Sequence, residues 1–298
     1  MSEVKSGYVA LLGRPNVGKS TLMNALIGEK IAITSAKAQT TRNKIMGVLN
    51  RTHSQIIFFD TPGVHKAKNK LGDYMVKTAL DTIQDMDLVL FLVDATEKRG
   101  DGENFILEVL SQARRPVLLV VNKIDKLSSK EQVLQAISSY TKDFEFAAVL
   151  PLSALQDKNF EELTIEIEKN LPIGPKYYDE EVLTDQPERA IAAEIIREKI
   201  LTCTRDEVPH AVAVQVEGFK ERENGDIFIR STIFVERDSQ KGILIGAKGA
   251  MLKKIGALAR SDIEGLLQTK VFLELWVKVN NDWRNNKRSL KEYGYYNG

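Results

Sequence analysis

The chain of 298 residues has little cysteine, little histidine and no long apolar run. Its single cysteine, Cys203, cannot form an internal disulfide or build a cysteine-based zinc site, so a reducing compartment is expected. The three histidines show no metal-ligand spacing. No segment approaches the roughly 18 apolar residues of a membrane span, and the first residues do not form a signal-peptide pattern. The sequence therefore predicts a cytoplasmic protein.

The composition is that of an ordinary globular protein. Hydrophobic residues make up 43% and charged residues 28% of the chain, which excludes disordered and collagen-like classes, and the length predicts about two domains. The formal net charge of +1 hides an asymmetry: residues 241–298 hold eleven basic and five acidic residues, a net +6, which leaves −5 for residues 1–240. A basic C-terminal surface indicates binding to nucleic acid or anionic lipid.

The first part of the chain alternates short apolar runs with helix-prone stretches. Nearly continuous apolar runs of this length are typical of strands buried on both faces of a parallel sheet. We expect strands at residues 8–12, 55–59, 88–93, 117–121 and 147–150, and helices at 19–26, 71–85, 102–113, 129–140 and 159–169. The alternation predicts a doubly wound α/β domain with a mostly parallel sheet, whose ligands bind at the carboxyl ends of the strands.

A break at residues 171–175, Leu-Pro-Ile-Gly-Pro, separates this part from a second pattern. We expect a first domain over residues 1–171, a linker over 172–187 and a second domain over 188–298. The second domain has a helix at 188–201, two alternating runs on either side of Asn224-Gly225, a helical region at 249–267 and a third alternating strand at 271–279. This is a smaller α+β domain with a three-stranded sheet.

The first predicted strand leads into a phosphate-binding loop. The loop reads Gly13-Arg14-Pro15-Asn16-Val17-Gly18-Lys19-Ser20, and Thr21 follows in the helix that it opens. Glycines let backbone N–H groups close around phosphate oxygens, the lysine neutralises the terminal phosphates, and the serine hydroxyl binds Mg²⁺. The sequence therefore predicts a nucleoside triphosphate site.

Two further motifs predict the metal and the base, each at the end of a strand. Asp60-Thr61-Pro62-Gly63 follows residues 55–59; its aspartate can hold Mg²⁺ through water, and the Gly63 N–H can reach a γ-phosphate. In Asn122-Lys123-Ile124-Asp125 the last carboxylate can accept two hydrogen bonds from guanine, whereas adenine offers the wrong donors. Ser153-Ala154 completes the base pocket by analogy. The motifs predict GTP rather than ATP.

These motifs, with Gln39-Thr40-Thr41-Arg42 in the switch I position, resemble the bacterial Era-like GTPases, and the resemblance covers nearly the whole chain. It implies that Lys19, Thr41 and Gly63 are catalytic and that Thr41 binds Mg²⁺ together with Ser20 when GTP is present. The alternative is Thr40, because the sequence alone does not fix which hydroxyl points inward.

Val64 stands where many GTPases place a glutamine that orients the attacking water. An apolar side chain cannot do this, so slow intrinsic hydrolysis is expected. In relatives with this substitution a potassium ion can stand in for an arginine finger, with the loop asparagine, here Asn16, as a ligand. The alternative is that Asn16 only hydrogen-bonds within the loop.

The second domain carries a Gly-x-x-Gly turn, Gly246-Ala247-Lys248-Gly249, in the most basic part of the chain. A turn of this kind is weak evidence alone, but its place in the order αββααβ resembles a KH domain of type II, in which the turn admits a nucleic-acid backbone and an apolar groove takes bases. Ile243 and Ile245 are expected at that groove or in the core beside it, and Lys248, Lys253 and Lys254 are expected at phosphates. The tail from Trp283 to Tyr296 either stacks on bases or packs back on the sheet.

The function that the resemblance implies is a GTP-hydrolysing switch that binds single-stranded RNA near the 3′ end of 16S ribosomal RNA and assists maturation of the 30S subunit. RNA is expected to stimulate hydrolysis. The alternative is a peripheral signalling GTPase whose basic end binds anionic lipid on the cytoplasmic face of the cell membrane. A third possibility, an ATPase or metabolic kinase, is disfavoured by the motif that ends in Asp125.

Overall fold

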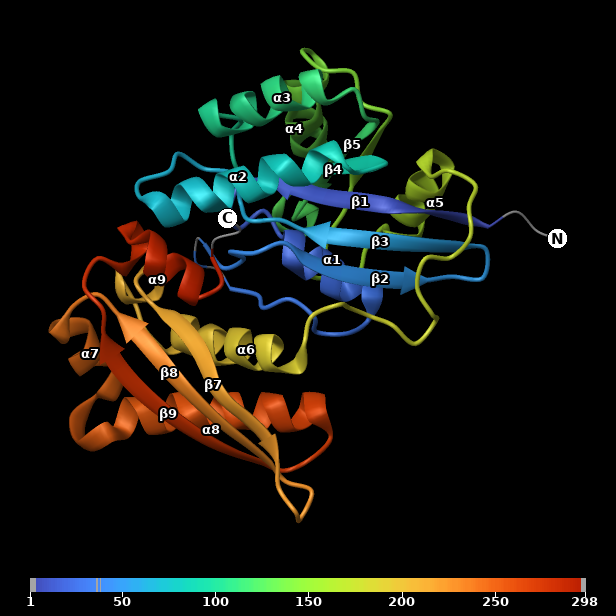
Figure 1. Ribbon diagram of the computed structural model, residues 1–298. Helices are drawn as coiled ribbons and strands as arrows, with labels where there is room; N and C mark the ends of the chain where they lie inside the picture. The colour runs from blue at the N-terminus through green and yellow to red at the C-terminus, as the bar shows by residue number, and fades with distance from the viewer. Residues whose placement is uncertain (1–3, 36, 38, 296–298) are drawn as a thin grey trace. The chain divides into compact units, whose positions relative to one another are not determined.

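The computed structural model of the protein describes residues 4–35, 37 and 39–295, which group into two compact units (Figure 1). The first is made mainly of residues up to Asp185 and the second mainly of residues from Gln186 onward. Within the described ranges, no helix is both long enough and apolar enough to cross a membrane.

The first unit is built on a six-stranded sheet with the order β2-β3-β1-β4-β5-β6. All neighbouring strands are parallel except β2 and β3, which are antiparallel. The strands are β1 (Lys5–Gly13), β2 (Ile45–Asn50), β3 (Ser54–Asp60), β4 (Leu88–Asp94), β5 (Val117–Asn122) and β6 (Ala148–Pro151). The predicted P-loop GTPase fold with a mostly parallel sheet is confirmed.

Helices cover both faces of this sheet, as the burial of its strands on two sides requires. One apolar cluster joins the sheet to α1 (Lys19–Ile27) and α5 (Phe160–Asn170). The other joins it to α2 (Lys70–Gln84), α3 (Asp101–Ala113) and α4 (Lys130–Thr141). A 3₁₀ turn, η1 (Ile124–Lys126), follows β5. The two cores hold the carboxyl ends of β1, β3 and β5 in fixed positions.

The antiparallel strand β2, at the edge of the sheet, is not among the strands predicted from the sequence. Gly47 interrupts its apolar run, and glycine normally weakens a strand. The glycine lets α1 pack close to the strand, because a Cβ atom at this position would lie 2.3 Å from Cδ1 of Ile27 and the isoleucine side chain would have to move. Tertiary packing, rather than local strand preference, therefore determines this element.

The segment predicted as a linker is hydrogen-bonded to the first unit over much of its length. The Ser6 amide donates to the carbonyl of Pro172, and the Val48 amide donates to that of Leu183. The Gln55 carboxamide oxygen accepts from the backbone amides of Tyr177 and Tyr178 at 2.7 and 3.0 Å. These hydrogen bonds attach the segment to β1, β2 and β3. The boundaries 1–171, 172–187 and 188–298 stay a prediction.

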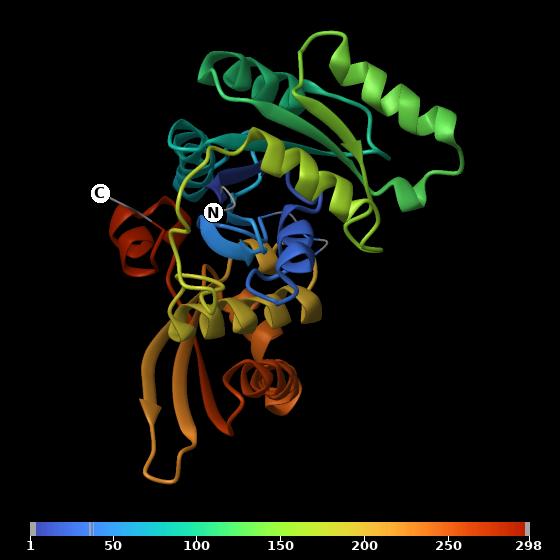
Figure 2. The ribbon, with the colours of Figure 1, turned by 90° about the vertical axis from the view of Figure 1, so that its right-hand side faces the viewer.

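The second unit has the element order of a type II KH domain, α6 (Glu188–Cys203), β7 (Ala213–Glu221), β8 (Ile227–Val235), α7 (Asp238–Ile245), α8 (Ala250–Leu267) and β9 (Val271–Val279). The sheet order is β7-β8-β9, with β7 antiparallel and β9 parallel to β8. Short 3₁₀ turns are η2 (Val208–His210), η3 (Ala247–Gly249) and η4 (Trp283–Asn285). Helices α6 and α8 lie on the same face of the sheet (Figure 2). The predicted KH fold is confirmed.

The C-terminal tail packs back on the KH sheet. Its helix α9 (Lys287–Glu292) follows Trp283, which is fully buried and donates from Nε1 to the carbonyl of Ala211 at 2.9 Å. Tyr293 stacks on Phe234 of β8 with ring centroids 4.4 Å apart. Of the two roles expected for the tail, the described part therefore has the packing role; Tyr296 lies outside the described residues.

Candidate nucleotide site and nucleic-acid groove

The phosphate-binding loop connects the end of β1 to the start of α1. Gly18 begins the helix with φ 101° and ψ 22°, a left-handed conformation that favours glycine. A Cβ atom here would also lie 2.2 Å from Nδ2 of Asn122. The second glycine of the motif is therefore required both by the backbone turn and by the close approach of the base-side loop.

Lys19 is buried at the centre of this loop. Its Nζ donates to the carbonyls of Gly13 and Arg14 at 3.3 and 3.0 Å. Burial lowers the pKa of Lys19 to about 8, and the nearby Asp60 carboxylate opposes this only in part. An ammonium held in this way against carbonyl oxygens is poised to exchange them for phosphate oxygens.

Three oxygen-bearing side chains meet beside Lys19. The Ser20 hydroxyl donates to Oδ2 of Asp60 at 2.5 Å and lies 2.9 Å from the Thr41 hydroxyl, which is 3.1 Å from the same carboxylate oxygen. The other oxygen of Asp60, Oδ1, is buried without a hydrogen-bond partner among the described residues. Burial raises the pKa of Asp60 above its usual range, opposed by Lys19 and the two hydroxyls.

This cluster fits a hard divalent cation. Mg²⁺ is bound by carboxylate and hydroxyl oxygens and by water, and Asp60 has an oxygen available in a buried site. Of the two switch I threonines, Thr41 has its hydroxyl at Ser20 and Asp60.

The loop after Asp60 packs tightly against the phosphate-binding loop. A Cβ atom on Gly63 would lie 2.5 Å from the backbone nitrogen of Pro15. The Val64 amide donates to the carbonyl of Gly13, and its side chain is buried in the apolar core. Nδ1 of His65 lies 2.8 Å from the carbonyl oxygen of Gly63. The side chain of Val64 therefore faces the core and offers no polar group to a water molecule.

Asn122 connects the phosphate-binding loop to the two loops that carry the base-side motifs. Its Nδ2 donates to the carbonyl of Val17 at 2.8 Å, and its Oδ1 accepts from the backbone amides of Lys123 and Ala154 at 2.7 and 2.9 Å. The side chain of Asn122 is 2% exposed. This asparagine therefore positions the neighbouring residues instead of presenting its own polar groups to a ligand.

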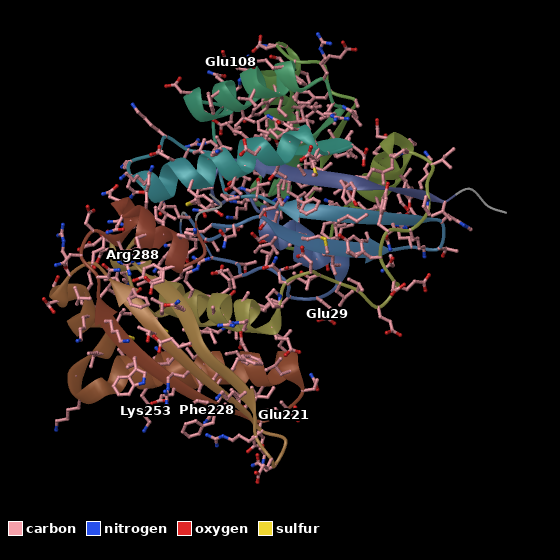
Figure 3. The ribbon with its side chains drawn as sticks, viewed as in Figure 1. Glu29, Glu108, Glu221, Phe228, Lys253 and Arg288 are labelled. Atoms are coloured by element: carbon pink, nitrogen blue, oxygen red, sulfur yellow. The ribbon has the colours of Figure 1, made fainter. Side chains whose placement is uncertain are left out.

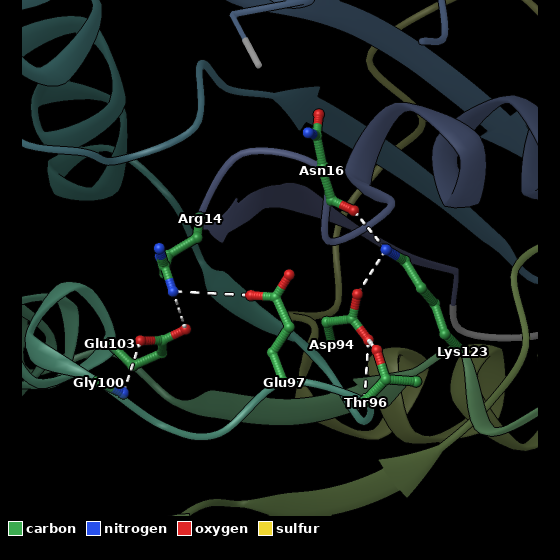
Figure 4. Close-up of polar contacts among 8 residues, drawn as sticks. All are labelled: Arg14, Asn16, Asp94, Thr96, Glu97, Gly100, Glu103 and Lys123. Atoms are coloured by element: carbon green, nitrogen blue, oxygen red, sulfur yellow. Dashed lines mark hydrogen bonds and ion pairs between the residues drawn. The ribbon is translucent and has the colours of Figure 1, made fainter. Parts of the chain in front are cut away.

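Lys123 and Asp94 form a second bridge to the phosphate-binding loop (Figure 4). Nζ of Lys123 donates to the Asn16 carbonyl at 2.7 Å and to Oδ2 of Asp94 at 2.5 Å. Burial would raise the pKa of Asp94, but hydrogen bonds from Lys123 and Thr96 outweigh it and lower the pKa. The side-chain amide of Asn16 points away from this bridge.

The Ser153-Ala154 motif orients the carboxylate of Asp125. The Ser153 hydroxyl donates to Oδ1 of Asp125 at 2.6 Å, which leaves Oδ2 and the remaining lone pairs for a ligand. Arg14, by contrast, is drawn to one side of its loop, where it pairs with Glu103 at 3.2 Å and Glu97 at 3.7 Å (Figure 4).

The second unit has a groove of about 450 Å³ between α8 and β9. Its lining combines small and apolar residues with two cations and consists of Gly249, Leu252, Lys253, Gly256, Ala257, Arg260, Leu273 and Leu275. It begins at the Gly-x-x-Gly turn, where Gly246 has φ 70° and a Cβ atom would lie 2.9 Å from the Met251 amide nitrogen. A strand of nucleic acid fits such a groove, with its backbone at the turn.

The chain matches two known families, one for each unit. Residues 8–123 match the family described as 50S ribosome-binding GTPase, and residues 207–284 match the KH domain. The chain is 55% identical to GTPase Era of Lacticaseibacillus paracasei over 295 residues, covering 99% of this chain and 98% of the relative. It is 56% identical to GTPase Era of Geobacter metallireducens over 292 residues, covering 98% of each.

The chain belongs to the GTPase Era family. A crystal structure of Era in complex with MgGDPNP and nucleotides 1506–1542 of 16S ribosomal RNA has a TM-score of 0.96 and 42% identity, covering 99% of this chain and all of that one. A variant of Aquifex aeolicus Era bound to GDP·AlF₄⁻ has a TM-score of 0.95 at the same identity and coverage. As an Era protein, the chain is a GTPase with a C-terminal KH domain.

In this chain most of the predicted nucleotide-site residues lie at the carboxyl ends of β1, β3 and β5, whereas Thr41 precedes β2, and Ser153 and Ala154 follow β6. Asp94 and Arg260 were not among the predicted site residues. Asp94 ends β4 and was missed, although its place at a strand end was a usable signal. Arg260 lines the groove only because α8 packs beside β9.

The predicted RNA-site residues are distributed unevenly about the groove. Gly249 and Lys253 line it, whereas Ile243 and Ile245 lie on α7 and are not among its lining residues. Ile243 is 49% exposed, and Ile245 packs against the apolar core of the KH unit. A role for these two isoleucines in RNA contact stays a prediction.

Proposed function

We propose that this Era protein is a GTP-dependent switch that binds the 3′ end of 16S ribosomal RNA and assists maturation of the 30S subunit. The observation that carries the proposal is the pairing, within one chain, of the oxygen cluster at Asp60 with an open groove behind a Gly-x-x-Gly turn. The Era complex with MgGDPNP and nucleotides 1506–1542 of 16S ribosomal RNA supports both halves.

In the nucleotide half, backbone N–H groups between Gly13 and Ser20 bind the phosphates and Lys19 neutralises their charge. Asp125, oriented by Ser153, accepts hydrogen bonds from guanine. Ser20, Thr41 and Asp60, the last through water, would hold Mg²⁺, and the ion would supply positive charge beside the phosphates. The Gly63 amide hydrogen-bonds the γ-phosphate.

Water positioning is the weak step of this site, because the side chain of Val64 is buried in the core. Slow intrinsic hydrolysis follows. We assign to Asn16 a side-chain contact to a potassium ion that supplies positive charge near the phosphates. The direction of its amide, away from the Lys123 bridge, supports this assignment.

In the RNA half, the groove takes unstacked bases on Leu252, Leu273 and Leu275. The cations Lys253 and Arg260 stand at its side and contact phosphates, which gives affinity without reading sequence.

The test compares hydrolysis by the full chain with and without an RNA oligonucleotide of the 16S 3′ end. We expect RNA to raise the rate. Equal rates, together with no enrichment of 16S RNA when the GTP-loaded protein is crosslinked to cellular RNA, would contradict the proposal.

The proposed site of action is the cytoplasm, with peripheral association at the inner face of the cell membrane as a second prediction. Flotation with anionic vesicles across a salt series measures membrane association, and a gel shift with RNA over the same series measures RNA binding. Flotation without an RNA shift would favour the membrane role.

A further inference from the structure

The KH sheet has a second face, which α6 and α8 do not cover. Side chains alternate along a strand, so Leu273 and Leu275 of β9 line the groove while Phe272, Glu274 and Trp276 point to the opposite side. Phe272 and Trp276 are 54% and 55% exposed, which is unusual for two large aromatic residues so close together.

Aromatic rings and arginines are ordered on this outer face. Phe228 of β8 is paired in register with Phe272, and their rings stack with centroids 5.8 Å apart. The Arg222 guanidinium lies over both rings, 5.1 Å from Phe228 and 4.8 Å from Phe272, and Arg230 lies 5.5 Å from Phe228. Figure 3 shows the Phe228 ring projecting from the sheet. We name Arg222, Phe228, Arg230, Phe272 and Trp276 the aromatic platform.

The charges on this face favour an anionic partner. Glu274, which lies between Phe272 and Trp276 on this face, pairs with Arg230 at 2.8 Å and also accepts from Nε1 of Trp276 at 3.0 Å. Arg222 and Lys220 have no carboxylate within ion-pair distance among the described residues. Rings with exposed faces beside cations of this kind are the combination that binds unpaired bases and their phosphates.

We infer that the aromatic platform is a second binding surface for single-stranded RNA, reached from the α8/β9 groove around the edge strand β9. The inference rests on the proposed function, because the groove and the platform share β9. A Gly-x-x-Gly turn holds only about four nucleotides. An RNA that continues past the groove meets the other side of the same strand, where its bases stack on Trp276 and Phe272.

The test uses two single-stranded RNA probes from the 16S 3′ end, one of about four nucleotides, which the groove alone holds, and one about three times as long. The double variant Phe272→Ala/Trp276→Ala should weaken binding of the long probe about 10- to 100-fold and leave the short probe unchanged. Leu266→Ala, which truncates another exposed apolar side chain of the KH unit, is the matched control and should change neither. Both platform side chains are more than half exposed, so the fold should survive, as a thermal melt would verify.

A second readout is the fluorescence of Trp276, since Trp283 is fully buried. The long probe should quench it, whereas Trp276→Phe should abolish most of the quenching and keep most of the affinity, because phenylalanine still stacks. Unchanged binding of the long probe by the double variant would overturn the inference. If that variant changed self-association of the protein and not RNA binding, the inference would be overturned as well. If Gly246→Ala also leaves the affinity for both probes unchanged, RNA binding in the groove, and with it the proposed function, is contradicted too.

Discussion

At the nucleotide site the polar side chains are held by the protein itself, whereas at the KH groove the cations are left to solvent. Asn122 alone bonds to three other residues, and Lys123 ties the phosphate-binding loop to Asp94. Lys253 and Arg260 have no hydrogen-bond or ion-pair partner among the described residues. A closed network is arranged in advance for one ligand, while an open groove with free cations binds by shape and charge. Single substitutions should therefore matter more at the first site than at the second.

The largest effect is expected at the guanine-binding carboxylate. Asp125→Asn replaces one carboxylate oxygen, an acceptor, with an amide NH₂ that faces the guanine amine, another donor. GTP affinity should therefore fall about 100-fold or more, since hydrogen bonds to charged groups contribute roughly 1.5–3 kcal/mol each. Xanthosine nucleotides, which carry an acceptor there, should bind in its place. Titration with fluorescent GTP and XTP analogues measures both.

The matched control for this change is Asp85→Asn, at an exposed carboxylate just after α2. Its GTP affinity should equal that of the parent. GTP binding that is unchanged in Asp125→Asn would remove the base assignment.

The next effect tests the backbone of the KH turn. Gly246→Ala must adopt φ 70°, ψ 177°, a region open only to glycine, and brings Cβ within 2.8 Å of Cβ of Met251. The start of α8 should shift and RNA affinity should fall roughly tenfold, with GTP affinity unchanged. Gly242→Ala on α7, where a Cβ atom meets nothing within 4 Å, is the control for a gel shift. Equal losses in both variants would mean that the turn has no special role.

The nucleotide site was more predictable from the sequence than the groove. Each nucleotide motif is a short run at a strand end, so local chemistry predicted most of the site. The choice between Thr40 and Thr41 was left open because adjacent hydroxyls differ only in direction, which the fold determines. Arg260 and the strand β2 were missed because their roles come from contacts between segments distant in sequence. The packed tail was undecided for the same reason, since Trp283 is buried against Ala211.

A smaller effect is expected from the titration of Lys19. Burial lowers its pKa to about 8 in the nucleotide-free protein, and phosphates favour the charged form. GTP affinity should therefore hold below pH 8 and decline above it, by about tenfold at pH 9 relative to pH 7. Lys19→Met should bind weakly with no such slope between pH 7 and 9. A flat profile for the parent chain would show that Lys19 stays charged.

The rate of GTP hydrolysis should change several-fold with the monovalent cation in solution. Hydrolysis should be faster in potassium than in sodium at equal ionic strength, because the larger ion fits an asparagine oxygen and phosphate oxygens together. Asn16→Ala should lose this difference while keeping its GTP affinity. Full potassium stimulation in that variant would assign Asn16 to the loop alone.

The smallest effect concerns one cation of the groove. Lys253 lines the groove and Lys254, its neighbour on α8, does not, although both are exposed. Loss of one phosphate contact to a single strand should reduce the slope of log affinity against log salt by about 0.7 and weaken binding only a few-fold near 0.15 M salt. Lys253→Ala should show this change and Lys254→Ala should show less, in the same titration series. Equal slopes for the two variants would mean that the RNA phosphates respond to the general positive charge of α8 and not to the groove. The KH unit would then bind RNA by charge alone, with no defined course for the strand.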